Sequence, residues 1–300
     1  MWRGCKALWT LGMFLVLARS SSAQLFDPGD VIVTNIPYAG MDAPNGVLAI
    51  NPVTGDQDVV STGGLFVNPF DLRIAPNGNI IVLDGGSSGN SGTIISVDPK
   101  SGLQTALTTG GYLASAGSFG AVHVDAGGNV YVCLSGVGVF QVDPATGMQT
   151  IISGGGNLID PSGLASTSDG NLYVGDYTAL GGALFRIDVK SGTQTVIASG
   201  GMINGVIDIA VEPGGTVLIE NQNDSIVRVD PSNGMQTLVT SGLVGLNGLG
   251  VGSDGQIYVS SSPSSSDPSS IIRVDPVTGS QTTISTAGSF GFLGGLVQAP

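Results

Sequence analysis

Three aspartates at related positions of a repeating chain are the residues of this sequence best suited to bind a cation. Asp71 and Asp208 each stand at the start of a short strand-like segment, and Asp160 stands two positions before Ser162, the matching residue of a third segment. Carboxylate oxygens are the ligands that calcium and magnesium prefer, and a carboxylate pair can also act as general acid and base. The alternative is that each carboxylate caps a strand end or a turn. The first interpretation predicts a ligand site of Asp71, Asp160 and Asp208, with Asp71 and Asp208 as metal ligands.

The other groups that could do chemistry point to structural roles. His123 is the one histidine of the chain and lies within a predicted strand, so no Ser–His–Asp set can be argued and a satisfied structural histidine is expected. Cys133 follows two apolar residues of a predicted strand and is expected to be a small buried hydrophobe. No catalytic residue is assigned. Further polar residues follow predicted second strands and are expected near one face of the molecule: Asp84, Asp176, Glu220 and Asn221.

The elements that position these residues follow from a phrase that recurs six times. It reads apolar-x-apolar-(Asp/Asn)-Pro-x-x-Gly-x-Gln, with Val189 in place of the proline in one copy. A period of about 45 residues, with several short β-patterned runs in each unit, indicates a propeller of four-stranded blades. The phrase itself is turn chemistry, because Asp caps the backbone, Pro fixes φ and Gly adopts the left-handed conformation. The copies begin at Asn51, Asp98, Asp143, Asp188, Asp230 and Asp275.

The two ends of the chain complement each other. Residues 161–197 show the pattern of a whole blade, with strands predicted at 163–165, 172–174, 184–188 and 193–197. Residues 295–300 read as a first strand that lacks a second, and residues 29–33 read as a second strand that lacks a first. Joining them would hide two exposed sheet edges. The sequence therefore predicts an all-β, six-bladed β-propeller of four-stranded antiparallel blades, closed by pairing of the N- and C-terminal strands.

The first 23 residues have the pattern of a secretory signal peptide. Arg3 and Lys6 precede a short apolar run, and a Ser-Ser-Ala site precedes Gln24. We expect a signal peptide at 1–23 and the propeller at 24–300, with a retained membrane anchor as the alternative. Without the signal peptide, six basic residues stand against 22 acidic ones, a net charge of −16. Such a surface repels nucleic acid and anionic lipid and suits cations, basic partners or neutral glycans.

Two segments carry a resemblance to known propeller families. Residues 161–176, with Pro-Ser-Gly-Leu-Ala and later Leu-Tyr-Val-Gly-Asp, resemble an NHL repeat, and residues 246–259 are similar to repeats of gluconolactonase (regucalcin)-like propellers. The second family holds a divalent cation in its central channel on Glu, Asn and Asp at the entry of inner strands. Asn247 matches that Asn, whereas the family's early Glu has no counterpart, since Glu212 is the first glutamate here. The resemblance adds Asn247 to the ligand-binding residues and to the metal set of Asp71 and Asp208, with calcium as the candidate cofactor.

These observations predict a secreted β-propeller, extracellular or periplasmic, that acts as a ligand- or protein-binding module. The expected partner is a protein, a small molecule or a glycan, without nucleic-acid binding or membrane insertion, and the chain is expected to be a monomer. The alternative is a divalent-cation-dependent hydrolase of the lactonase kind, or a lyase, with its site at the central channel; a purely structural surface component is a third interpretation. The missing family ligands and the single histidine argue against catalysis.

Overall fold

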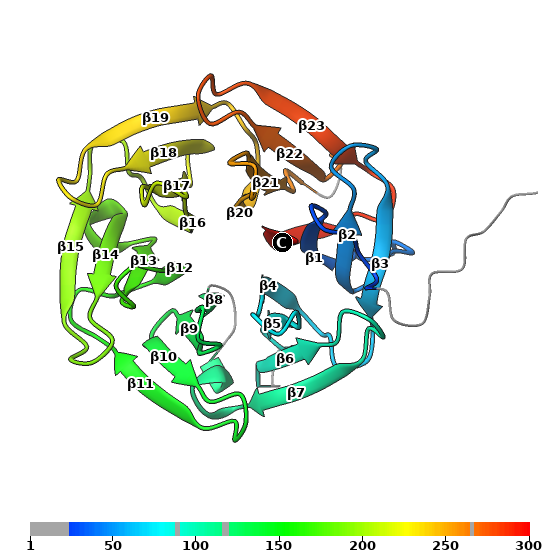
Figure 1. Cartoon of the computed structure of the whole chain (residues 1–300), viewed down its shortest axis with the longest axis horizontal. Coiled ribbons are helices and arrows are strands. Elements are labelled where there is room, and N and C mark those ends of the chain that lie inside the picture. Colours follow the sequence, from blue (N-terminus) through cyan, green and yellow to red (C-terminus); the bar gives the residue numbers. More distant parts are fainter. Residues whose placement is uncertain (1–23, 88–90, 116–119, 265–266) are drawn as a thin grey trace, which may run out of the picture.

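Six sheets surround a central channel (Figure 1). The computed structural model describes residues 24–87, 91–115, 120–264 and 267–300, so the predicted signal peptide at 1–23 lies outside the described residues. Each sheet has four strands, and every neighbouring pair within a sheet is antiparallel. The predicted six-bladed β-propeller of four-stranded blades is therefore confirmed.

Each blade begins at the channel and ends at the rim of the disc. From the channel outward, three blades are β24 (Phe292–Gln298), β1 (Val31–Ile36), β2 (Gly46–Ile50) and β3 (Gln57–Thr62); β4 (Pro69–Ile74), β5 (Ile80–Asp84), β6 (Thr93–Val97) and β7 (Gln104–Thr109); and β8 (Gly120–Val124), β9 (Val130–Leu134), β10 (Gly138–Val142) and β11 (Gln149–Ser153). The other three are β12 (Pro161–Ser166), β13 (Leu172–Asp176), β14 (Ala183–Ile187) and β15 (Gln194–Ser199); β16 (Val206–Val211), β17 (Val217–Asn221), β18 (Ser225–Val229) and β19 (Gln236–Ser241); and β20 (Leu246–Val251), β21 (Ile257–Ser261), β22 (Ser270–Val274) and β23 (Gln281–Thr286).

The last strand of the chain closes the ring. β24 is the inner strand of the blade whose other three strands are β1, β2 and β3. Its register sets Val297 opposite Ile32 and Leu296 opposite Val33. Beyond the strand, Ala299 N–H donates to the Asp30 carbonyl at 2.7 Å. The predicted pairing of the two termini is confirmed, and it gives the closing blade its inner strand.

The core lies between neighbouring blades, which pack face to face. One cluster, for example, joins Ala121 and Cys133 of one blade to Val174 and Phe185 of the next. β-Branched and aromatic residues supply most of these contacts because they suit a pleated, buried surface. Cys133 is a free thiol with no exposed area, as predicted.

The repeated phrase forms the turn between the third and fourth strands. Asp98 Oδ1 accepts the N–H groups of Lys100 and Ser101 at 2.8 and 2.9 Å. Gly102 has a φ of +69°, and a Cβ there would lie 2.5 Å from the Val60 carbonyl oxygen of the neighbouring blade. Glycine is thus required both by the backbone conformation and by the close approach of two blades. The prediction that the phrase is turn chemistry is confirmed.

The glutamine of the phrase fastens each blade to the preceding one. Gln104 Nε2 donates to Ser61 Oγ at 2.9 Å and to the Gly63 carbonyl at 3.1 Å, and its Oε1 accepts Leu65 N–H at 2.6 Å. In the copy that begins at Asp230, Gln236 Oε1 accepts Met202 N–H at 2.6 Å, but the residue equivalent to Ser61 is Ala198, which offers no hydroxyl. Four more copies repeat the hydroxyl contact: Gln57 with Ser285, Gln149 with Thr108, Gln194 with Ser153, and Gln281 with Thr240.

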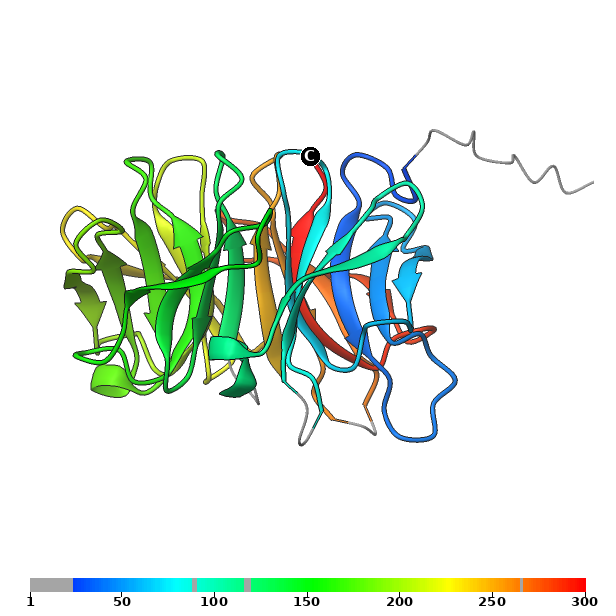
Figure 2. The same ribbon diagram turned by 90° about the horizontal axis from the view of Figure 1, so that it is seen from below.

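The two faces of the disc differ in their loops (Figure 2). The turn face carries the tight turns within blades, including the repeated phrase, and the C-terminus. The opposite side, here called the mouth face, carries the connections from second to third strands and from each outer strand to the next inner strand. Two short 3-10 helices, η1 (Gly111–Ser115) and η2 (Ala179–Gly181), lie on the mouth face.

Candidate ligand site at the channel mouth

A cavity of about 120 Å³ opens where the inner strands begin, on the mouth face. Strand order explains the convergence, because each inner strand contributes its first residues to the same ring around the channel. The cavity therefore brings Asp71, Asp208 and Asn247, three of the predicted site residues, to one place. It is lined by Phe70, Asp71, Gly120, Ser162, Ile207, Asp208, Asn247, Phe292, Gly294 and Gly295.

Arg73 joins the two aspartates at the base of this cavity. Its Nη1 lies 2.7 Å from Asp71 Oδ1, and its Nη2 lies 3.7 Å from Asp208 Oδ1. The three side chains are only 12%, 6% and 7% exposed, respectively. Sequence reasoning placed Arg73 in an inner strand but gave it no role. The available signal was its spacing, because a basic residue two positions after Asp71 lies on the same side of the strand.

Both carboxylates also tie neighbouring blades together. Asp71 Oδ2 accepts Val122 N–H at 2.9 Å, and Asp208 Oδ2 accepts Leu249 N–H at 3.1 Å, in each case from the inner strand of the next blade. A small residue is needed at the matching position beside Asp71, since a Cβ on Gly295 would lie 1.8 Å from Asp71 Oδ1. These contacts give both aspartates a structural role between neighbouring inner strands.

One guanidinium is shared by two buried carboxyl groups. Burial raises the pKa of Asp208 to about 7, partly opposed by Arg73 and reinforced by the charge of Asp71. Burial likewise raises the pKa of Asp71, against the lowering effect of Arg73 and of two backbone N–H donors. Arg73 can balance one negative charge fully, so the base of the cavity carries excess negative charge whenever both aspartates are ionised.

Glu220 adds a third carboxyl group directly behind Asp208. It lies opposite Asp208 in the β16–β17 pair and has no exposed area. Among the described residues, neither of its oxygens has a hydrogen-bond partner. Burial raises the pKa of Glu220 well above its ordinary value, and the charges of Asp208 and Asp224 raise it further. Glu220 therefore holds its proton to a higher pH than an exposed glutamate does, whereas the sequence suggested only a polar residue near one face.

The protonated form of Glu220 suits its position. At the equivalent position of other blades, Thr34 Oγ1 donates to the Phe70 carbonyl at 3.2 Å and Ser260 Oγ donates to the Gly294 carbonyl at 2.7 Å. Both acceptors belong to the inner strand of the next blade. In these two blades the position presents a hydroxyl donor to a neighbouring carbonyl, and a neutral carboxylic acid is a donor of the same kind. The other three blades have Leu83, Cys133 and Gly175 there.

Replacing Glu220 by glutamine is expected to flatten the pH dependence of stability. The folded state holds the Glu220 proton more tightly than the unfolded chain, so this group stabilises the fold fully below its ordinary pKa of 4.5. That contribution is lost as the pH rises through the raised pKa of the folded state. The E220Q side chain stays neutral throughout, and each unit of pKa elevation corresponds to about 1.4 kcal/mol. Urea unfolding at about pH 5 and about pH 8 measures the difference.

The matched control for this prediction is Asp208→Asn, which removes the neighbouring titration while Glu220 is kept. The D208N variant should retain a fall in stability toward alkaline pH, because burial is the largest cause of the raised pKa of Glu220. Parallel pH profiles for the wild type and E220Q would contradict protonation of Glu220 in the folded state.

Asp160 and His123 lie outside this cavity. Asp160 is part-buried on the mouth face, where its N–H donates to Asp176 Oδ2 at 2.9 Å and its Oδ1 has no partner among the described residues. His123 Nε2 lies 2.5 Å from Ser166 Oγ, and burial together with Arg73 lowers the pKa of His123 to about 3. His123 is thus a neutral, hydrogen-bonded side chain, in agreement with the structural role predicted for it.

Three polar residues at the ends of second strands hold the loops of the mouth face. Asp84 accepts Val67 N–H at 2.8 Å, and Asn221 accepts Asn204 N–H at 3.1 Å. Asp176 accepts the N–H groups of residues 159 and 160 in the same way. These side chains therefore fix the connections between blades that surround the cavity.

The metal-binding prediction for Asp71, Asp208 and Asn247 stays a prediction. The cavity brings the three residues together, but the guanidinium of Arg73 already contacts Asp71 and approaches Asp208. Across the described parts of the chain, no group of three or more His, Cys, Asp or Glu side chains is placed to hold a metal ion. Arg73 thus already offsets part of the charge of the two carboxylates.

Comparisons with known proteins identify the fold. A chain of the nidogen/laminin complex matches with a TM-score of 0.69 at 11% identity, over 89% of this chain and 97% of that chain. TolB from Acinetobacter baumannii matches with a TM-score of 0.69 at 12% identity, over 90% and 67% of the two chains. Virginiamycin B lyase from Staphylococcus aureus matches with a TM-score of 0.52 at 15% identity, over 73% and 70%. At these low identities the three likenesses show a shared fold alone.

Sequence comparisons give no closer relation. No family model matches the chain, and a search of curated proteins found no match. The resemblance to NHL and gluconolactonase-like repeats therefore stays a prediction, and the structural likeness carries no activity with it. In the described part of the chain, no helix has the length and apolar character needed to cross a membrane.

Proposed function

We propose that this chain is a secreted binding module that holds a ligand or protein partner on its mouth face. One observation carries the proposal: the cavity at the channel mouth and eight exposed apolar side chains lie on the same face of the disc. The signal-peptide pattern at 1–23 and the net charge of −16 that follows its removal support a secreted location. The nidogen/laminin match, a protein–protein complex, is consistent with a binding role for this fold.

The apolar side chains of the mouth face all come from the loops that connect strands on that face. Eight of the 17 large apolar residues that are exposed among the described residues lie there. A concave site with exposed apolar groups on the same face is a candidate interaction surface. We call these eight residues the apolar ring: Met41, Leu65, Val67, Tyr112, Ile159, Leu180, Met202 and Val244.

A peptide selection tests where this module binds. Random dodecapeptides displayed on phage are selected on the immobilised protein, and the affinities of individual peptides are then measured against two double variants. Ile159→Lys with Leu180→Lys changes the apolar ring, at positions that are 58% and 64% exposed. We expect the selected peptides to bind this variant at least about tenfold more weakly, because charges replace apolar contacts.

The matched control places the same substitutions on the turn face. Val53→Lys with Val277→Lys changes residues that are 90% and 91% exposed, so neither variant disturbs the core. Binding should be retained within about twofold by this control. Peptides that lose affinity equally for both variants, or for the control alone, would place binding elsewhere and overturn the proposal.

A further inference from the structure

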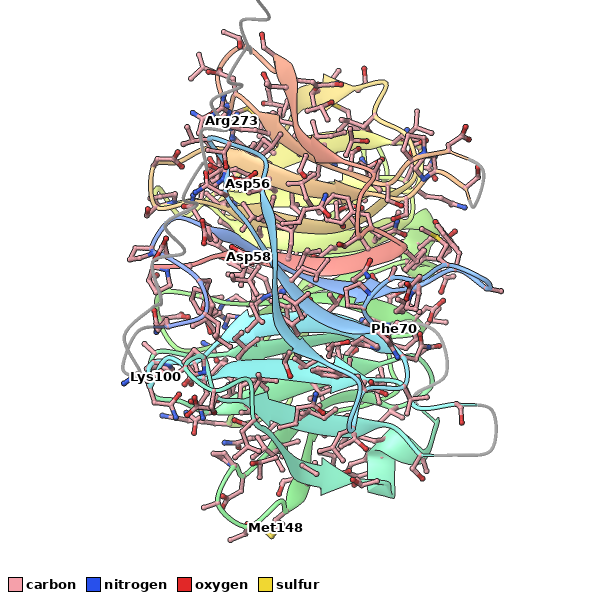
Figure 3. The ribbon with its side chains drawn as sticks, turned by 90° about the vertical axis from the view of Figure 1, so that its right-hand side faces the viewer. Asp56, Asp58, Phe70, Lys100, Met148 and Arg273 are labelled. Carbon is pink, nitrogen blue, oxygen red and sulfur yellow. The ribbon has the colours of Figure 1, made fainter. Side chains whose placement is uncertain are left out.

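The basic residues are distributed unevenly between the two faces. Residues 24–300 contain six Lys and Arg residues, all of them described. Arg73 lies in the channel, and Figure 3 shows Lys100 and Arg273 on the side of the disc away from Phe70. Among the described residues, no lysine or arginine belongs to a mouth-face loop. The five outside the channel lie in or beside turns of the turn face: Lys100, Arg186, Lys190, Arg228 and Arg273.

Two of these arginines are held on the turn face by ion pairs. Arg186 contacts Asp169 of an Asp-Gly turn, and Arg228 Nε lies 2.5 Å from Glu212 Oε2. Arg228 Nη2 also donates to the Pro276 carbonyl at 3.0 Å, which fixes its direction further. These contacts keep both cations away from the mouth face.

The mouth face, in contrast, carries charges of one sign. Asp42 and Asp267 are exposed there, and Asp160 and Asp224 are part-exposed. At the centre of the face, the base of the cavity holds two carboxyl groups that share the single guanidinium of Arg73. An anionic partner is therefore repelled from the whole face, while a cationic partner meets favourable potential at the rim and at the centre.

The walls of the cavity favour the same kind of ligand. Phe70 and Phe292 line it above the carboxyl groups, and aromatic rings attract cations through their faces. A volume of about 120 Å³ is small, so it suits the end of one side chain rather than a folded element. The residues of the apolar ring, on the loops of the same face, offer contacts over a wider area.

We propose that the occupant of the mouth face is a basic polypeptide segment, which sets apolar side chains against the apolar ring and directs a lysine or arginine side chain toward Asp71 and Asp208. This inference rests on the proposed function and specifies its ligand. The turn face has five exposed apolar residues of its own, but there the acidic residues alternate with basic ones, whereas the described mouth-face loops carry acidic residues alone.

The composition of the selected dodecapeptides tests this inference separately from the binding location. Peptides that depend on the apolar ring should be enriched in Lys or Arg together with apolar residues, compared with the starting library. Replacing the basic residues of a selected peptide by Gln should weaken binding about tenfold, and replacing them by Glu should abolish it. Binding should also weaken as salt is raised.

Charge-neutralising variants of the protein provide the matched control. Asp42→Asn with Asp267→Asn removes two charges from the mouth face, and Asp56→Asn with Asp254→Asn removes two exposed charges from the turn face. The first pair should weaken peptide binding by about threefold or more, and the second should leave it within about twofold. An equal loss in both pairs would show general attraction of cations to an acidic protein and would overturn the inference.

Two further outcomes separate this inference from the proposed function. Neutral or acidic peptides that bind at the apolar ring would overturn the basic ligand while leaving the binding module in place. In a competition experiment, free butylamine or calcium could bind in the cavity without displacing the peptide. That result would show that the cavity takes a small cation instead of a side chain, and it would also overturn the inference. Displacement of the peptide by butylamine, weakened by Asp208→Asn, would support it.

Discussion

Removal of residues 293–300 is expected to abolish the cooperative unfolding transition of the whole propeller. These residues supply most of β24, the inner strand of the closing blade. Their loss uncovers the inner edge of β1 and removes Leu293, Leu296 and Ala299, none of which is more than 1% exposed, from the core. A closed ring depends on every blade-to-blade contact, so the opened chain loses both a buried strand and its two neighbouring interfaces. Circular dichroism during heating measures the transition.

A shorter truncation separates ring closure from general damage at the C-terminus. Pro300 is exposed, whereas Ala299 N–H donates to the Asp30 carbonyl and the Ala299 carbonyl accepts Gly29 N–H at 3.0 Å. Deleting Pro300 alone should leave the transition within about 2 °C of the wild type, because it removes no such contact. Unchanged cooperative melting of the longer truncation would contradict the dependence of the ring on β24.

The architecture could be predicted from the sequence because each repeat contains residues that form a local turn. Asp98, Gly102 and their counterparts encode a turn through contacts with residues two to four positions away, and such contacts can be read along the chain. Closure of the ring could also be predicted, because the sequence at each terminus has the pattern of an incomplete blade. In the blade at residues 161–197, the sequence predicts a first strand that begins at Gly163, whereas the strand begins at Pro161. Strand ends are set by partner strands rather than by local propensity.

The contacts of the site were harder to predict from the sequence because they join residues from different blades. Asp71 and Asp208 were found from their equivalent positions, but Arg73 lies between them only because the ring brings two blades, 135 residues apart in the chain, to one channel. The same holds for Glu220, whose burial depends on the neighbouring blade. Gln104 appeared in the sequence as part of a turn, whereas its side chain contacts the preceding blade. Residues at equivalent positions of the repeat are expected to share a role. This expectation does not reveal a residue that differs from its equivalents, such as the single buried cation Arg73.

Replacing Arg73 by methionine is expected to destabilise the fold by about 3–5 kcal/mol at about pH 8, the range for breaking a buried ion pair. Methionine retains most of the apolar stem, so the loss is mainly electrostatic. Without the guanidinium, the pKa values of Asp71 and Asp208 rise further, and both groups take up protons in the folded state. The cost is therefore largest at alkaline pH and shrinks toward about pH 4, where both carboxyl groups are neutral. Urea unfolding across this range measures the effect.

His123 supplies a direct readout of the same substitution, because it is the one histidine of the chain and its titration can be followed by NMR without overlap. Burial and the nearby charge of Arg73 lower its pKa to about 3. In R73M the pKa of His123 should rise while staying below its ordinary 6.5, since burial, the larger cause, remains. Adding Asp208→Asn to R73M should recover part of the lost stability at about pH 8, because one of the two uncompensated carboxylates is then neutral. A loss in R73M that is equal at both ends of the pH range, with the His123 pKa unchanged, would show that Arg73 acts by packing alone and that the two aspartates do not depend on its charge.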